Sequence, residues 1–260
     1  MSFRAYARAV GDGWPGQGAG LILVEEPVST HLLARRIVQE YSAENTWSPS
    51  ADVLAWRQTG GVGRDGRAWS SPPGLGVYAS LIRPLTPAES SPATQALPLV
   101  VATALCKAVN RYLGGRCQVK WPNDLVVEGR KLAGILIDTT SRGQDEGIAV
   151  ISFGVNHGAM PESVATAMEI EAPGAVAMPE LAGRLVAAVD AALESGASVD
   201  EIVDQYRALS LHREGDTLRC RAGGVEIEGQ FQGFDSNGFL RLRVDGEERL
   251  LAAGEIRSDG

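Results

Sequence analysis

Four short segments of the sequence combine charged side chains with glycine or proline in a way that could hold an anionic ligand. The first is residues 58–69, QTGGVGRDGRAW, with four glycines within seven residues and two arginines. Glycines leave backbone N–H groups free to turn toward an anion, and guanidinium groups bind carboxylates and phosphates through paired hydrogen bonds. The segment lacks Gly-Lys-Ser/Thr and leads into a predicted strand, so it is neither a P-loop nor a dinucleotide-binding loop. Taken alone, it could also be an ordinary solvated loop.

The other three segments lie at the ends of predicted strands: KWPND at 120–124, GRKLAGIL at 129–136 and SFGVN at 152–156. Read alone, Asn123 and Asp124 could simply hold a turn, and Lys131 could be a solvated side chain. The functional interpretation is that Lys131 reaches the ligand face of a sheet, where it would stabilise negative charge shared by a carboxylate and a phosphate. Gly134 would then let the ligand approach the backbone closely.

Hydrophobic periodicity predicts the elements that position these segments. The expected strands are 21–24, 52–57, 77–82, 117–121, 125–127, 132–138 and 147–153, and the expected helices cover 32–41, 97–112, 180–193 and 199–209. We expect residues 1–19 and 161–178 to be irregular. After residue 210, short alternating segments separated by turn residues predict a small all-β barrel. The expected organisation is therefore an irregular segment 1–20, a catalytic domain 21–209 and a β domain 210–260.

Bulk properties exclude several classes of protein. The 260 residues carry a net charge of −8, which argues against broad nucleic-acid binding. The three cysteines and three histidines show no metal-ligand spacing, so no metal site is expected. We find no apolar run that approaches the length of a membrane span and no signal sequence, so we expect a cytoplasmic protein without membrane contact.

In this order, the four segments resemble those of the bacterial biotin protein ligase family, from about Leu21 to Asn156, with a looser fit in the C-terminal β segment. The resemblance implies an α+β fold, in which a mixed-sheet, class II synthetase-like biotin/lipoate ligase domain precedes an SH3-like β-barrel. It implies that biotin and ATP, with Mg²⁺ on the ATP, form biotinyl-5′-AMP. The biotin is then transferred to a lysine of a biotin carboxyl carrier domain, the expected partner. The enzyme would be a monomer or a homodimer.

The resemblance also implies roles for individual residues. The biotin site would comprise Ser29, Thr30, His31, Gln58, Gly61, Val62, Gly63, Arg64, Lys131 and Gly134. The ATP and adenylate site would comprise Arg67, Trp69, Lys120, Asn123, Lys131 and Asn156. The catalytic residues would be Lys131, which binds the reacting carboxylate and α-phosphate, Asp124, the general base for the incoming amine, and Arg64.

Three positions depart from the family pattern, and alternatives remain. Val62 stands where the family loop usually has arginine, His31 where asparagine is frequent, and Ser152 where glycine is common. One alternative is a lipoate protein ligase, although its Arg-Arg-x-Ser-Gly-Gly-Gly loop is absent. Another is a biotin-binding regulatory module without activity, which Val62 and Ser152 suggest and Lys131 and Asp124 oppose. A DNA-binding repressor is disfavoured, because a first strand near residue 21 leaves no room for a helix-turn-helix domain.

Overall fold

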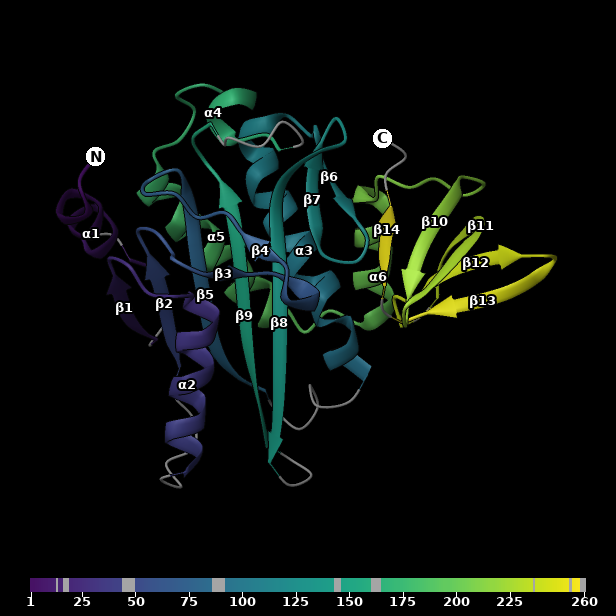
Figure 1. The fold of residues 1–260 in the computed structure, drawn as a ribbon, viewed down its shortest axis with the longest axis horizontal. Coiled ribbons are helices and arrows are strands. Elements are labelled where there is room, and N and C mark those ends of the chain that lie inside the picture. Colours follow the sequence, from purple (N-terminus) through teal and green to yellow (C-terminus); the bar gives the residue numbers. More distant parts are fainter. Residues whose placement is uncertain are drawn as a thin grey trace.

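A seven-stranded mixed sheet forms the largest part of the fold (Figure 1). The computed structural model describes residues 1–12, 14–15, 19–43, 50–85, 92–142, 146–159, 165–235, 237–252 and 254–257. The sheet order is β1-β2-β5-β9-β8-β7-β6. Its strands are β1 (Gly20–Val24), β2 (Ala51–Ala55), β5 (Gly76–Leu85), β6 (Cys117–Lys120), β7 (Asp124–Val127), β8 (Arg130–Arg142) and β9 (Glu146–Asn156). Only β1 and β2 pair in parallel among these neighbours, so the predicted mixed sheet is confirmed.

Helices cover both faces of this sheet. Helix α2 (Thr30–Ala43) lies on one face, and α3 (Pro92–Leu113), α5 (Met178–Leu193) and α6 (Val199–Leu209) lie on the other (Figure 1). Successive strand residues point to opposite faces. Val150 of β9 accordingly packs in the cluster beneath α2, whereas the next residue, Ile151, belongs to the larger cluster that includes α3 and α5. In β9, Ser152 and Gly154 alternate with Val150 and therefore also face α2.

A second, five-stranded antiparallel sheet follows α6 (Figure 1). Its strands are β10 (Thr217–Ala222), β11 (Val225–Phe234), β12 (Leu240–Val244), β13 (Glu247–Leu251) and β14 (Glu255–Arg257). The hydrophobic core continues into it, since the Tyr206 ring of α6 meets the Phe234 ring edge-on at 5.2 Å between centroids. The predicted run of short strands after residue 210 is confirmed. The domain boundary at 210 and the SH3-like class stay predictions.

The prediction that the N-terminal segment is irregular was wrong for residues 3–11, which form a helix. Ser2 caps helix α1 (Phe3–Gly11), since its hydroxyl accepts a hydrogen bond from the Ala5 backbone N–H at 3.4 Å. Tyr6 and Val10 lie one turn apart and are buried in the main core. The glycines of residues 11–20 had obscured this short apolar stripe. A second short helix, α4 (Met168–Glu171), likewise interrupts the expected irregular segment 161–178, of which residues 161–164 lie outside the described part.

Helix α3 has a long apolar stretch. Among the residues that the structure describes, it is the one helix with a stretch long and apolar enough to cross a membrane, Ala96–Leu113, and 67% of that stretch is buried within the fold. The helix packs between the sheet and helices α5 and α6. Burial on several sides explains its wide apolar surface.

A buried ion-pair network joins the sheet to α5 and to the N-terminal segment. Arg83 of β5 lies 2.7 Å from Asp52 of β2 and 2.8 Å from Asp190 of α5. The indole N–H of Trp14 donates to Asp52 at 2.9 Å. Burial raises the pKa of Asp52, although Arg83 partly offsets this effect. One buried guanidinium group therefore compensates the negative charge of two carboxylates.

We predict that Arg83→Met destabilises the fold by about 3–5 kcal/mol, because it leaves two buried carboxylates without their cation. The measurement is the free energy of unfolding from urea denaturation. The matched control is Arg36→Met, which removes an exposed arginine paired with Glu40 on α2 and should leave that free energy nearly unchanged. Equal effects of the two substitutions would contradict the network's contribution.

Candidate active site

A cavity of about 160 Å³ lies on the α2 face of the sheet. Strands β5, β8 and β9 form its floor, and the hairpin of β3 (Gly61–Val62) and β4 (Ala68–Trp69) covers it. A short 3₁₀ turn, Arg64–Gly66, joins the two strands of this hairpin, which we call the flap. The lining includes every residue predicted from the sequence except Gly61 and Asn156. The structure thus brings together predicted residues from Ser29 to Gly134, about a hundred positions apart, and adds residues 254–256 to the same cavity.

Two glycines form the floor beneath the flap. Gly134 of β8 pairs with Gly154 of β9. A Cβ atom at Gly154 would lie 2.4 Å from Trp69 Nε1, and one at Gly134 would lie 3.0 Å from Trp69 Cζ3. The indole of Trp69 therefore rests on both backbones. The sequence had predicted that Gly134 admits a ligand; in the structure it also admits this side chain of the flap.

A β-bulge turns Lys131 toward the same face. Leu125 pairs with Ala133 but Val126 pairs with Lys131, so β8 contains one extra residue, Leu132, opposite β7. Lys131 and Gly134 would point to opposite faces of a regular strand, since they are three residues apart. The bulge removes this difference, and a Cβ atom at Gly134 would lie 3.4 Å from Lys131 Nζ. The sheet irregularity is what brings the lysine into the cavity.

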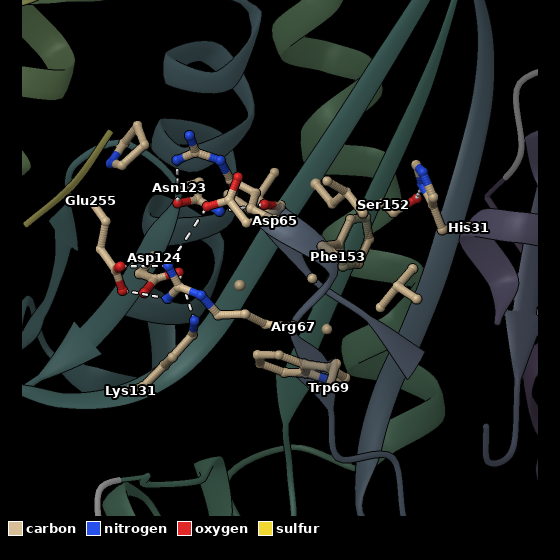
Figure 2. A pocket seen from close by; sticks show the side chains of 18 of the residues that line it. His31, Asp65, Arg67, Trp69, Asn123, Asp124, Lys131, Ser152, Phe153 and Glu255 are labelled. Carbon is tan, nitrogen blue, oxygen red and sulfur yellow. Dashed lines mark hydrogen bonds and ion pairs between the residues drawn. The ribbon is translucent and has the colours of Figure 1, made fainter. Parts of the chain in front are cut away.

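Lys131 lies at the centre of a charged cluster (Figure 2). Its Nζ is 2.8 Å from Asp124 Oδ1 and 5.3 Å from the centre of the Trp69 ring. Asn123 is held against β8, since its amide donates to Ile135 O at 2.6 Å. Lys120 also lines the cavity, and burial lowers its pKa, although Asp124 partly offsets this effect. Burial favours the neutral form of Lys120, whereas the nearby carboxylates favour its charged form. A bound phosphate could take the place of these carboxylates.

The small sheet closes the cavity through two contacts with the flap. Arg64 donates to the carbonyl oxygen of Gly254 at 3.0 Å and to Asn123 Oδ1 at 3.3 Å. Arg67 forms a bidentate ion pair with Glu255, the first residue of β14 (Figure 2). We call these two contacts the clasp. Both flap arginines are therefore tied to a part of the chain nearly two hundred residues away.

Polar side chains gather at the opposite end of the cavity. Gln58 accepts from the Thr30 backbone N–H at 2.7 Å and donates to Ser71 Oγ at 2.7 Å. His31, the next residue of α2, lies 2.8 Å from Ser152 Oγ through its Nδ1 atom. Both His31 and Ser152 line the cavity and are buried. This end offers hydrogen-bonding groups, whereas the Lys131 end offers charge.

Two predicted residues, Asn156 and Gly61, do not line the cavity. Asn156 is buried, and its amide donates to Thr166 O at 3.0 Å and to Lys131 O at 3.4 Å. Asn156 therefore lies outside the cavity lining in this structure, and its nucleotide contact stays a prediction. Gly61 is needed for hairpin pairing instead, since a Cβ atom there would lie 2.5 Å from Trp69 O.

The lining also contains residues that sequence analysis did not predict. These are Asp65, Ala68, Ala79, Trp121, Pro122, Ile135, Leu136, Ser152, Phe153, Gly154, Gly254, Glu255 and Ile256. Most of them lie in or next to the motifs, which was the available signal. Residues 254–256 had no such signal, because they come from a different sheet.

Known proteins share both the sequence and the fold of this chain. The profile of the Biotin/lipoate A/B protein ligase family matches residues 29–156, a span that contains the four segments. The biotin–acetyl-CoA-carboxylase ligase of Paracoccus denitrificans is 32% identical over 225 residues, which cover 80% of this chain and 90% of that protein. The chain belongs to the biotin protein ligase family.

Other members support this assignment over nearly the whole chain. The biotin–acetyl-CoA-carboxylase ligase of Mycobacterium tuberculosis is 28% identical over 96% of this chain and 94% of its own length. The biotin protein ligase from Aquifex aeolicus, solved in complex with biotin and ATP, superposes with a TM-score of 0.73 and 25% identity. That superposition covers 92% of this chain and 97% of the Aquifex chain. The mixed α+β fold is thus that of a biotin protein ligase.

Within this family fold, we predict that Gly154→Ala lowers the rate of adenylate formation by about a hundredfold, because the added methyl group displaces Trp69 and the flap. The measurement is pyrophosphate release with the ATP and acid substrates. A matched control is Gly114→Ala, since the space beside Gly114 is open and its helix end is remote from the cavity, although its positive φ of 60° adds local strain. Unchanged activity of Gly154→Ala would show that the close Trp69 contact is dispensable.

A second prediction concerns the clasp. Glu255→Gln removes the carboxylate from Arg67 while keeping nearly the same shape, so the flap should open more readily. We expect the adenylate to leak into solution about tenfold faster, because exposed ion pairs of this kind contribute little beyond 1 kcal/mol. The measurement is release of labelled adenylate after rapid mixing. Glu228→Gln, which breaks the exposed Arg219 pair in the same sheet, is the control; an equal effect there would contradict a role for the clasp.

Proposed function

We propose that this chain is a biotin protein ligase, which joins biotin to ATP as biotinyl-5′-AMP and then transfers the biotin to a lysine of a biotin carboxyl carrier domain. The observation that carries the proposal is the cavity in which Lys131 and Asp124 meet beneath a flap with two arginines. Relatives with this activity cover 90% and 94% of their own lengths in alignment with this chain. The shape and charge of the site suit an acid and a nucleotide phosphate together.

In the first step, a carboxylate oxygen of biotin attacks the α-phosphorus of ATP, and pyrophosphate leaves. Negative charge gathers on the phosphate oxygens, where Lys131 and Arg64 would stabilise it. Lys131 is paired with Asp124 in the structure. On binding, the anionic groups of the ligand would replace Asp124 as the partner of the Lys131 ammonium group. Mg²⁺ enters with ATP as part of the substrate, and the Asp65 carboxylate in the lining is an oxygen ligand of the kind that it accepts.

In the second step, the carrier lysine attacks the acyl carbon of the adenylate, and AMP leaves. The attacking amine must lose a proton, and Asp124 is the proposed acceptor. Its side chain is 24% exposed, so an incoming amine can reach it once Lys131 has turned to the phosphate. One carboxylate would thus hold Lys131 before the reaction and accept a proton at its end.

The flap and the clasp would protect the intermediate between the two steps. The adenylate is a mixed anhydride that water hydrolyses, so a closed cover would protect it by excluding water from the cavity. We infer that the five-stranded sheet is an SH3-like module whose residues 254–256 complete this cover. Release of the clasp would then expose the acyl carbon to the carrier domain.

Biotin is preferred over lipoate as the acid. The family profile covers ligases for both acids, but the relatives with wide coverage are biotin ligases. The polar end of the cavity around Thr30 and Gln58 suits a ureido ring, whereas a dithiolane offers no hydrogen-bond donors. The test is transfer of labelled biotin or labelled lipoate to a purified carrier domain with ATP. Transfer of lipoate alone would overturn the choice, and biotin binding without adenylate would favour an inactive regulatory module.

We predict that Lys131→Ala lowers biotin transfer to the carrier domain by about a thousandfold, the scale of losing one preorganised charge in a closed site. Initial rates of labelled biotin incorporation provide the measurement. Lys107→Ala, an exposed lysine of α3 that contacts Gln205, is the matched control and should retain full activity. Turnover like that of the unaltered chain in Lys131→Ala would falsify the mechanism.

A further inference from the structure

A chain of buried hydrogen-bonding side chains connects the polar end of the cavity to the protein surface. Nε2 of His31 lies 3.2 Å from Asp138 of β8, and Nδ1 of His31 lies 2.8 Å from Ser152 of β9. Ser152 lies 2.8 Å from Ser80 of β5. Ser80 lies 2.9 Å from Thr30, at the start of α2. Four elements far apart in sequence therefore contribute to one connected chain.

The chain continues from Thr30 to Gln58. Oγ1 of Thr30 donates to Oε1 of Gln58 at 3.2 Å, and Nε2 of Gln58 donates to Ser71 at 2.7 Å. The Ser71 hydroxyl in turn donates to Trp69 O at 3.2 Å. The acceptor Oε1 thus terminates the chain, because the Gln58 amide nitrogen is committed to Ser71. Every hydrogen between His31 and Gln58 must come from three hydroxyls or from the imidazole.

Asp138 determines which imidazole nitrogen carries the hydrogen. Its carboxylate accepts only, so a neutral His31 places its hydrogen on Nε2 and leaves Nδ1 as an acceptor. Burial lowers the pKa of His31 and Asp138 partly offsets this, so the neutral form prevails at pH 7. Among the described residues, the charged groups beside His31 are Asp138 of β8 and Arg35 of its own helix, and Arg35 lies 3.3 Å from the same Asp138 oxygen.

A count of hydrogens shows that this chain is one hydrogen short. Four contacts link Nδ1 of His31, the hydroxyls of Ser152, Ser80 and Thr30, and Oε1 of Gln58. The three hydroxyls supply three hydrogens, and neutral His31 supplies none at Nδ1. One contact therefore brings two acceptor atoms together without a hydrogen between them, and a ligand N–H that donates to either atom offsets this repulsion. Protonated His31 supplies the fourth hydrogen and removes this preference.

We propose that His31 is a positioning residue that, together with Asp138, keeps the hydroxyl chain of Ser152, Ser80 and Thr30 short of one hydrogen and so selects a ligand head group with N–H donors, in a pH-dependent manner. This inference rests on the proposed function, because the ureido ring of biotin is the head group considered. Thr30, His31 and Ser152 all line the cavity, so the chain faces the ligand directly. His31 acts through the hydroxyls and takes no part in the bond-making steps.

The first test measures the dissociation constant of biotin by calorimetry, without ATP, from about pH 7.5 down to a pH at which NMR shows that His31 is protonated and the fold intact. We expect affinity to fall by about tenfold as His31 gains a proton, because the contact between two acceptor atoms is then filled by the imidazole hydrogen and the ligand N–H no longer relieves a repulsion. His31→Leu leaves three hydrogens for three contacts, so it should bind biotin about tenfold more weakly at pH 7.5 and show no such pH dependence. A pH-independent affinity in the unaltered chain would overturn the inference.

A second variant guards against misfolding of His31→Leu. Asp138→Asn frees His31 to place its hydrogen on Nδ1, so affinity at pH 7.5 should fall in the same direction while the cavity lining is untouched. The matched control is Asp204→Asn, which weakens an exposed pair with Arg207 on α6 and should behave like the unaltered chain. Equal biotin affinity in Asp138→Asn and Asp204→Asn would contradict the role of the tautomer.

Steady-state kinetics separate this inference from the proposed function. A positioning role at the head group raises KM for biotin in His31→Leu while kcat and KM for ATP stay near their unaltered values. A proportional loss of kcat would instead show that His31 serves the chemistry, and it would overturn the inference. Adenylate formation by the unaltered chain tests the proposed function independently. If the chain bound biotin but formed no adenylate, the proposed function would fail, and the pH dependence of biotin binding would still test the role of His31.

Discussion

The ion pair of Lys131 and Asp124 depends on a single irregularity in the sheet, the extra residue of β8 opposite β7. Without that bulge, Lys131 would point into the main core, on the side of the sheet that α3 covers. There an ammonium group would be costly, because burial of an unpaired charge is opposed by several kcal/mol. The bulge converts a strand of alternating side chains into one that presents a lysine and a glycine on the same face. The remaining site residues are arranged around this placement.

The two sheets of the protein meet at the flap. Arg64 and Arg67 are placed by the β3–β4 hairpin that covers the large sheet, and their partners are Gly254, just before β14 of the small sheet, and Glu255, its first residue. A hairpin of two-residue strands has little cohesion of its own. Its position over the cavity therefore depends on Trp69 resting on two glycines beneath it and on the clasp beside it. The same guanidinium groups therefore connect the cover of the cavity to the small sheet.

Two of the three departures from the family pattern are in direct contact. His31 and Ser152 lie 121 positions apart in the sequence but hydrogen-bond at 2.8 Å. Each is buried, and each would leave an unmatched polar group if the other were apolar. They therefore form one polar unit rather than two separate changes. Val62, the third departure, lines the cavity from the flap, where Arg64 and Arg67 supply the remaining positive charge.

Apolar periodicity and the four motifs are local patterns, so the sequence alone predicted most helices, most strands and about half of the residues that line the cavity. The mixed sheet followed from the resemblance to biotin protein ligases. The sequence missed α1, whose two buried side chains were outweighed by nearby glycines. Only the tertiary structure decided the face of Lys131, the covered position of Asn156 and the contribution of Glu255. Each of these depends on a pairing register or on a contact between distant segments, and neither leaves a pattern in neighbouring residues.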